Sequence, residues 1–266
     1  MSLPILTYHA VESAAREHET LPPNQALYLV KRDLFERQMR FLAERRFRTL
    51  LVDELIAVAQ GRSSLPEQGV CLTFDDGSAS DYQVAFPILK KYSLNATFFV
   101  VTERVGTPGY VTWDQLREMS AHGMSVQSHS RTHPFMSQCA PSQVKEELHL
   151  SKEAIERHLG KTVAAFAVPG GDWNEECRLA AKECGYRAIC TSQPGVNGRK
   201  FELDDLERLS IRRADSFDQF VSFVTLDRWV LFRYQVKETL LKLAKRGMGL
   251  NRYNRVRAWL LSRMAH

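Results

Sequence analysis

Two adjacent carboxylates, Asp75 and Asp76, end a short apolar run and are followed at once by Gly77. Neighbouring side chains of a regular strand point to opposite faces, but a glycine lets the backbone turn so that both carboxylates can reach one pocket. One carboxylate could then bind a metal ion while the other handles a proton. The alternative is a plain turn in which an Asp side chain accepts local backbone hydrogen bonds.

Two histidines four residues apart, His129 and His133, follow another apolar run. This separation can bring two imidazoles to one metal ion from a single turn. With a carboxylate they form a ligand set of two nitrogens and one oxygen, which leaves coordination positions open for water and substrate. Open positions are typical of catalytic sites. An incidental histidine pair is the alternative, but the expected position at the end of a strand favours the ligand set.

The elements that must position these residues follow from the pattern of the chain. Short apolar or β-branched runs alternate with helical patterns, and repeated βαβ units predict a parallel sheet, closed or nearly closed as a barrel. The expected strands are PILTYHAV, GVCLTF, ATFFVV, MSVQSH, AAFAV and YRAICT, and the expected helices span about 32–46, 81–92, 112–122, 142–159 and 175–184.

Three candidate functional segments each lie at the end of an expected strand: Thr73 to Gly77, Ser128 to Pro134, and Phe166 to Gly170. In parallel α/β folds the carboxyl ends of the strands collect functional groups at one edge of the sheet. We therefore expect the carboxylates and the histidines to meet in one site.

Bulk composition is ordinary for a globular protein, with 44% hydrophobic and 25% charged residues among 266. The five cysteines show no CxxC spacing, so neither a disulfide framework nor a thiolate zinc site is expected. The first residues lack a basic region and a long apolar run, and no segment reaches the length of a membrane span. A cytoplasmic enzyme is the expectation.

The last part of the chain is strongly basic. Residues 226–266 contain ten Lys and Arg against two acidic residues, a net charge of +8 that leaves −3 for the remainder. We predict a division into a catalytic domain, 1–224, and a basic amphipathic helical tail, 225–266. The tail could contact the inner face of an anionic membrane, or it could pack on the barrel with its charged face solvated. No nucleic-acid-binding motif accompanies the charge, so nucleic acid is not expected as a partner.

The motifs TFDDG and HSRTHP, in this order and about fifty residues apart, resemble those of the polysaccharide deacetylase family, the NodB homology domain of carbohydrate esterase family 4. The resemblance covers roughly residues 1–224. It implies an α/β fold, a distorted (β/α)7-type barrel, here followed by a C-terminal helical appendage.

The resemblance also implies an activity and a site. Asp75 would be the general base, while Asp76, His129 and His133 would hold a divalent metal, Zn²⁺ or a similar ion. Water activated by the metal would attack the amide carbonyl of an N-acetyl group. The implied substrate is an amino-sugar-containing glycan or a lipid-linked amino sugar, and the sequence leaves open which one.

The chain departs from the family pattern in two places. Ala167-Val168-Pro169 stands where many members have Arg-x-Pro, whose arginine orients the base, and Arg208 or Arg212 is a candidate replacement. No clear Leu-His motif, the usual position of the catalytic acid, is found near the end of the barrel. The candidate acid is His9, because a subgroup resembling exopolysaccharide deacetylases carries an equivalent Tyr-His. A histidine that only satisfies a backbone carbonyl is the alternative.

Candidate substrate-binding residues are Tyr8, Pro169, Gly170 and Trp173. The Trp173 ring could stack on a pyranose. Two other functions stay open at this point: hydrolysis of a small amide that is not a glycan, and glycan binding with weak catalysis.

Overall fold

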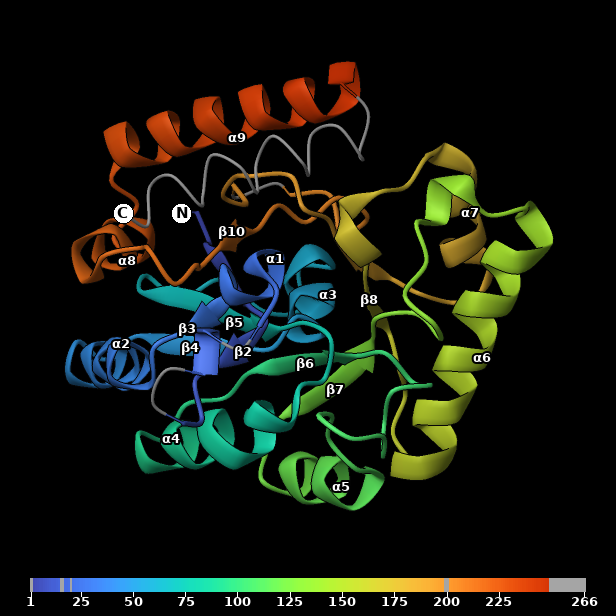
Figure 1. The fold of residues 1–266 in the computed structure, drawn as a ribbon, viewed down its shortest axis with the longest axis horizontal. Helices are drawn as coiled ribbons and strands as arrows, with labels where there is room; N and C mark the ends of the chain where they lie inside the picture. Colours follow the sequence, from blue (N-terminus) through green and yellow to red (C-terminus); the bar gives the residue numbers. More distant parts are fainter. Residues whose placement is uncertain (1, 15–16, 20, 199–200, 249–266) are drawn as a thin grey trace.

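A computed structural model describes residues 2–14, 17–19, 21–198 and 201–248 (Figure 1). Its centre is an eight-stranded parallel sheet that curls into a half-barrel surrounded by helices. The strand order is β10-β1-β5-β6-β7-β8-β9, and β4 pairs with β5 beside this path. The strands are β1 (Ile5–Tyr8), β4 (Arg48–Leu50), β5 (Gly69–Phe74), β6 (Thr97–Val100), β7 (Ser125–Ser128), β8 (Ala165–Ala167), β9 (Ala188–Cys190) and β10 (Leu209–Ser210).

A single segment links the two ends of this sheet. Leu206 forms a parallel bridge with Cys190 at the end of β9, and three residues later Leu209 of β10 pairs with Leu6 of β1. Backbone hydrogen bonds continue this link, because the Thr191 N–H donates to the Leu206 carbonyl at 2.9 Å. This segment therefore joins the two ends of the half-barrel, in agreement with the barrel-like parallel sheet that the alternation of strands and helices predicted.

Alternate residues of the strands face two different cores. Leu6, Leu72 and Phe98 belong to a cluster shared with the surrounding helices. Their neighbours Ile5 and Cys71 belong to a second cluster, within the curl of the sheet. This alternation follows from the two-residue period of a strand. It sets the direction of any side chain that continues a strand past its last residue.

The predicted helices form within a few residues of their expected bounds. Local signals explain several ends: the Thr112 side chain caps α5 in a capping box with Gln115, and α6 begins at Pro141 and stops at Gly160, where φ is +63°. The 81–92 helix contains a π-helical first part, η2. The helices are α2 (Arg32–Glu44), η2 (Asp81–Ala85), α4 (Phe86–Lys91), α5 (Trp113–Ala121), α6 (Pro141–Leu159) and α7 (Glu175–Glu183).

Several short elements were not predicted. Besides β4, these are α1 (Pro23–Ala26), α3 (Glu54–Ala59) and a two-stranded sheet of β2 (Ala10–Val11) and β3 (Leu29–Val30). Single turns of 3-10 helix are η1 (Glu17–Glu19), η3 (Met136–Gln138) and η4 (Pro169–Gly171).

Two helices follow the barrel, α8 (Phe217–Val224) and α9 (Arg228–Met248), and α9 lies as a long rod along one side of the molecule (Figure 1). The helical appendage is thus confirmed as far as Met248, and the predicted tail from 249 to 266 lies outside the described residues. The domain boundary expected at residue 224 coincides with the end of α8 and stays a prediction. Among the described helices, none is both long and apolar enough to cross a membrane.

Candidate active site

The alternation of side chains along β5 directs Asp75 toward the inside of the curled sheet. Cys71 faces the inside of the curl, so Asp75, four residues on, points to the same side. There its two carboxylate oxygens each accept a hydrogen bond at 2.8 Å from the two terminal nitrogens of Arg208, a bidentate pair with both side chains buried. The Arg208 Nε–H donates to the Thr191 carbonyl at 3.0 Å, which fixes the guanidinium plane.

Of the two arginines considered as partners of the base, the structure places Arg208 on Asp75. Arg212 instead forms a bidentate pair with Glu238 of α9, at 2.7 Å for both bonds. The group that orients the expected base therefore comes from the segment that closes the sheet.

The pKa of Asp75 reflects two opposing effects. Burial disfavours the carboxylate, but the positive charge and hydrogen bonds of Arg208, together with nearby His129, outweigh it and hold the pKa below its usual range. Asp75 is consequently ionised at neutral pH.

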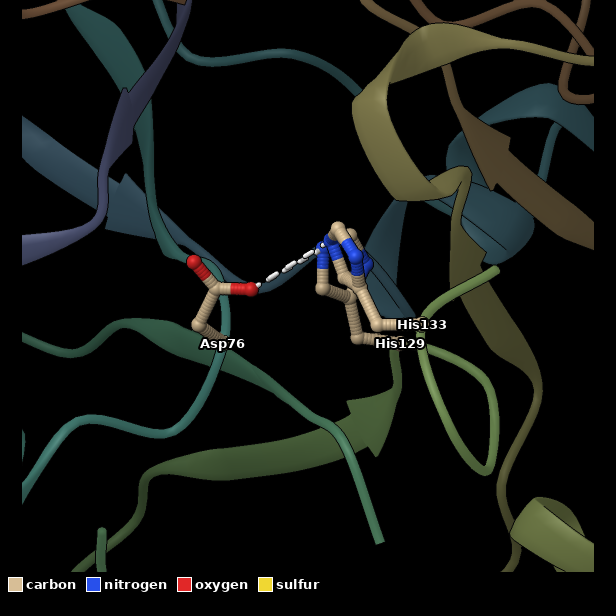
Figure 2. A group of neighbouring side chains, drawn as sticks. All are labelled: Asp76, His129 and His133. Carbon is tan, nitrogen blue, oxygen red and sulfur yellow. Dashed lines mark ion pairs between the residues drawn. The ribbon is translucent and has the colours of Figure 1, made fainter. Parts of the chain in front are cut away.

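Asp76, His129 and His133 converge from the ends of β5 and β7 (Figure 2). The distance from Asp76 Oδ1 is 3.4 Å to His133 Nε2 and 3.8 Å to His129 Nε2. One potential ligand atom from each residue lies within 4.8 Å of the other two. The predicted ligand set thus comes together in space.

The backbone that presents these side chains is unusual. Asp76, Ser130 and His133 all have positive φ, at +78°, +67° and +68°. Such values are costly for residues other than glycine and collect at functional sites. At Asp76 the left-handed turn, continued by Gly77 at +75°, brings the second carboxylate beside the first.

Hydrogen bonds set the orientation of His129. Its Nδ1 lies 2.9 Å from the carbonyl of Ala167, the last residue of β8. Since a carbonyl can only accept, Nδ1 donates this hydrogen bond, and Nε2 is the nitrogen directed toward Asp76. The pKa of His133 falls to about 4 because the ring is partly buried and lies beside His129, so His133 is neutral at neutral pH.

These residues fit a divalent metal ion. Two imidazole nitrogens and one carboxylate oxygen, with a backbone carbonyl behind one imidazole, form a three-ligand set typical of catalytic zinc and related ions. Arg104 also approaches Asp76 Oδ1, at 3.5 Å, and adds positive charge at the rim.

His9 lies close enough to the carboxylates to respond to their charge. Burial lowers the pKa of His9, and Asp75 and Asp76 raise it without offsetting that effect. Its ring packs on Tyr28 with 4.4 Å between ring centres. Its Nδ1 is buried and makes no hydrogen bond within the described residues, which is uncommon for a buried polar atom.

Tyr8 needs correction as a substrate-binding residue. Its side chain is fully buried, its ring packs against Phe35 and Phe74, and its hydroxyl donates to Gln38 at 2.9 Å. Side chains alternate along β1, and Tyr8 lies on the side that packs against the helices, not on the side that faces the site. Tyr8 has a packing role.

The other predicted substrate residues follow β8. Pro169 is buried, Gly170 is exposed with φ +59°, and Trp173 is half-buried against the main core. A side chain at position 170 would come within 3.4 Å of the Phe135 ring, so the β8 loop lies beside the loop after His133. Their contact with substrate stays a prediction.

Three residues at the site were not predicted as catalytic or ligand residues. Arg208 was considered only as one of two replacements, since ERLSIRR contains no motif. Arg104 and Tyr28 lie in segments without a chemical pattern, and only the fold brings them to Asp76 and His9.

The chain is similar to known proteins in sequence and in fold. A family model described as polysaccharide deacetylase matches residues 62–189. YxkH of Bacillus subtilis (strain 168), a polysaccharide deacetylase by name, is 30% identical over 222 residues, which cover 84% of this chain and 76% of YxkH. The chain belongs to the polysaccharide deacetylase family, whose members are carbohydrate deacetylases.

More distant relatives extend the comparison. The poly-beta-1,6-N-acetyl-D-glucosamine N-deacetylase of Staphylococcus aureus (strain MSSA476) is 25% identical over 175 residues, and the match spans 60% of either protein. Among solved structures, the Streptococcus pyogenes deacetylase PplD in complex with acetate superposes with a TM-score of 0.78 at 29% identity, covering 84% of this chain and 98% of PplD. IcaB from Ammonifex degensii superposes with a TM-score of 0.73 at 26% identity, covering 84% of this chain and 97% of IcaB.

Proposed function

We propose that this protein is a divalent-metal-dependent hydrolase that removes N-acetyl groups from the amino sugars of a glycan. One observation carries the proposal: His129 Nε2 lies between the two carboxylates, 4.0 Å from Asp75 Oδ2 and 3.8 Å from Asp76 Oδ1. A proton acceptor and a metal-ligand set thus share one small site, and Arg208 holds the acceptor apart from the ligands.

The chain's own groups have separate tasks. Asp75, ionised and fixed by Arg208, accepts a proton from the attacking water. When bound by Asp76, His129 and His133, a divalent ion such as Zn²⁺ would acidify that water and polarise the acetyl carbonyl. Asp75 is a weak base and requires a water that is acidified in this way.

His9 is the proposed acid for the departing amine. It lies near both carboxylates, and its Nδ1 has no partner among the described residues. Because burial makes the ring neutral at neutral pH, His9 must first gain a proton before it can donate one. The overall reaction consumes one water and yields acetate and a free amine.

The relatives support an N-acetylated glycan as the substrate class. The staphylococcal relative is named for poly-beta-1,6-N-acetyl-D-glucosamine, and PplD was solved with acetate, the product that this reaction releases. A lipid-linked N-acetylhexosamine would present the same amide. Both belong in the substrate panel.

The test is acetate release by zinc-loaded protein from β-1,6- and β-1,4-linked N-acetylglucosamine oligomers, lipid-linked N-acetylhexosamines and small acetamides. We expect release from at least one amino sugar and much slower release from the small amides. Faster hydrolysis of small amides than of every sugar would favour the alternative of an amidase. Full metal occupancy without any acetate release would favour a glycan-binding protein.

A further inference from the structure

The inner face of α9 is fixed on the barrel by specific contacts. Leu231 and Tyr234 are buried, and the Tyr234 hydroxyl accepts a hydrogen bond from the Ser210 N–H at 3.1 Å. One turn further on, Glu238 forms its bidentate pair with Arg212. Positions 231, 234 and 238 share one face of the helix, so the opposite face must point away from the barrel.

That opposite face is apolar. Trp229, Phe232, Val236 and Leu240 follow each other at spacings of three and four residues, and their side chains are 77%, 58%, 42% and 60% exposed. Elsewhere among the described residues, exposed large hydrophobic side chains are scattered, at Phe135 and Leu179. A contiguous exposed stripe of this kind marks an interaction surface.

Positive charge borders the stripe. Arg228, Arg233 and Lys237 are exposed and form no ion pair with any described residue. Two nearby acidic residues have other partners: Asp227 accepts hydrogen bonds from the first N–H groups of the helix, and Glu238 faces inward to Arg212. A third, Asp215, interacts electrostatically with Lys237 but accepts its hydrogen bonds from the Arg212 N–H and from Gln219. The outer face is therefore apolar in the middle, with cations at its edges.

We propose that this outer face of α9, formed by Trp229, Phe232, Val236 and Leu240, docks on an anionic lipid surface. An apolar helix face with aromatic residues and flanking cations is suited to lie in the interface of a membrane with negative headgroups. Two copies of the same face would bring their unpaired cations together, which opposes self-association.

Docking at α9 would bring the catalytic end of the barrel close to the lipid surface. Helix α9 contacts Ser210, the last residue of β10, and Arg212, which follows this strand, at the end where β1 leads into His9. The Arg212 guanidinium lies 6.0 Å from the centre of the Tyr28 ring, and Tyr28 packs on His9. Three contacts thus connect the docking helix to the proposed acid.

Vesicle flotation of the full-length protein tests this inference. Vesicles of phosphatidylcholine alone are compared with vesicles that also contain phosphatidylglycerol. We expect flotation with the anionic vesicles, weaker at high salt, and a loss of at least tenfold in Trp229→Ser/Phe232→Ser. Arg233→Gln and Lys237→Gln should each weaken binding about fivefold, the equivalent of about 1 kcal/mol per cation. Leu179→Ser, which removes a similarly exposed side chain from α7, is the matched control.

Three results would overturn the proposal. Flotation of Trp229→Ser/Phe232→Ser at the wild-type level would exclude this face. Flotation that is lost only when residues 249–266 are deleted would assign lipid binding to that segment. A concentration-dependent dimer that Trp229→Ser/Phe232→Ser abolishes, with no flotation, would identify a second copy as the occupant. Acetate release and circular dichroism of each variant separate loss of docking from loss of fold or activity.

Discussion

Arg208 and Asp75, 133 residues apart in sequence, form a buried bidentate ion pair with two hydrogen bonds of 2.8 Å. The arginine comes from the segment that links the last strands of the sheet to the first, so the geometry of the expected base depends on closure of the sheet. Removal of either partner would leave a buried charge without its counterion.

Replacement of Arg208 should therefore affect stability and the pH profile together. Arg208→Gln should lower the free energy of unfolding by about 3–5 kcal/mol. Arg208→Lys keeps the positive charge but loses the bidentate guanidinium geometry, so it should be more stable than Arg208→Gln. In both variants the pKa of Asp75 rises, so the acid limb of the pH–rate profile should move to higher pH. Arg212→Gln is the control, because Arg212 pairs with Glu238 away from Asp75. An unmoved acid limb in Arg208→Lys would argue against this role.

Metal binding should depend on the three converging ligands. His133→Ala and Asp76→Ala should each lower zinc affinity at least about tenfold, measured by calorimetry, and chelation should abolish acetate release from the wild type. His149→Ala, an exposed histidine on α6, should bind zinc as the wild type does. Equal zinc affinity in His133→Ala and His149→Ala would contradict the assignment.

Asp81 predicts a measurable pH dependence of stability. Its carboxyl is buried, and burial, with the charges of Asp76 and Asp75, outweighs a backbone hydrogen bond from Ser78 and raises its pKa well above the usual range. The unfolded chain loses this proton near about pH 3.9, whereas the folded protein keeps it to higher pH. The contribution of protonated Asp81 to the free energy of unfolding is therefore fully present below about pH 3.9 and is lost as the pH rises through its folded-state pKa.

Asp81→Asn should remove this dependence. In chelator, its free energy of unfolding should match that of the wild type near about pH 3.5 and exceed it by at least about 1 kcal/mol at about pH 7, the equivalent of about one pKa unit. Denaturant titrations at both pH values measure the difference. Asp33→Asn, an exposed change on α2, should show no such gain. A neutral-pH loss of stability in Asp81→Asn would mean that the carboxylate is charged and has a partner.

Tyr8→Phe tests the corrected role of Tyr8. Loss of the hydroxyl that donates to Gln38 should cost about 1 kcal/mol of stability, because a buried hydrogen bond disappears. KM and kcat should stay unchanged, since the side chain lies in the core. A rise in KM without loss of stability would instead support a contact between Tyr8 and the substrate.

The sequence was sufficient for the features that are set locally. The run GVCLTF predicts β5 to the residue, because a strand buried on both faces is apolar throughout. Asp75, Asp76, His129 and His133 could be grouped from the sequence alone, since parallel strands end at one edge of the sheet.

Features that depend on closure or on side-chain direction could not be read in this way. The pairing of Arg208 with Asp75 requires knowledge of where the last strand joins the first. Tyr8 and His9 are neighbours in a motif, yet the parity of β1 buries the tyrosine among the helices and leaves the histidine at the site. The short strand β4 has three residues, too few for a periodic signal.

Asp75 is proposed to act as a base beside the metal site without being one of its ligands, and this claim is central to the mechanism. The most direct measurement is acetate release by Asp75→Asn, with zinc content determined in the same sample. We expect zinc bound as in the wild type and acetate release reduced by about 10²–10⁴-fold, the usual contribution of general base catalysis. Zinc-loaded Asp75→Asn that releases acetate at the wild-type rate would contradict this role.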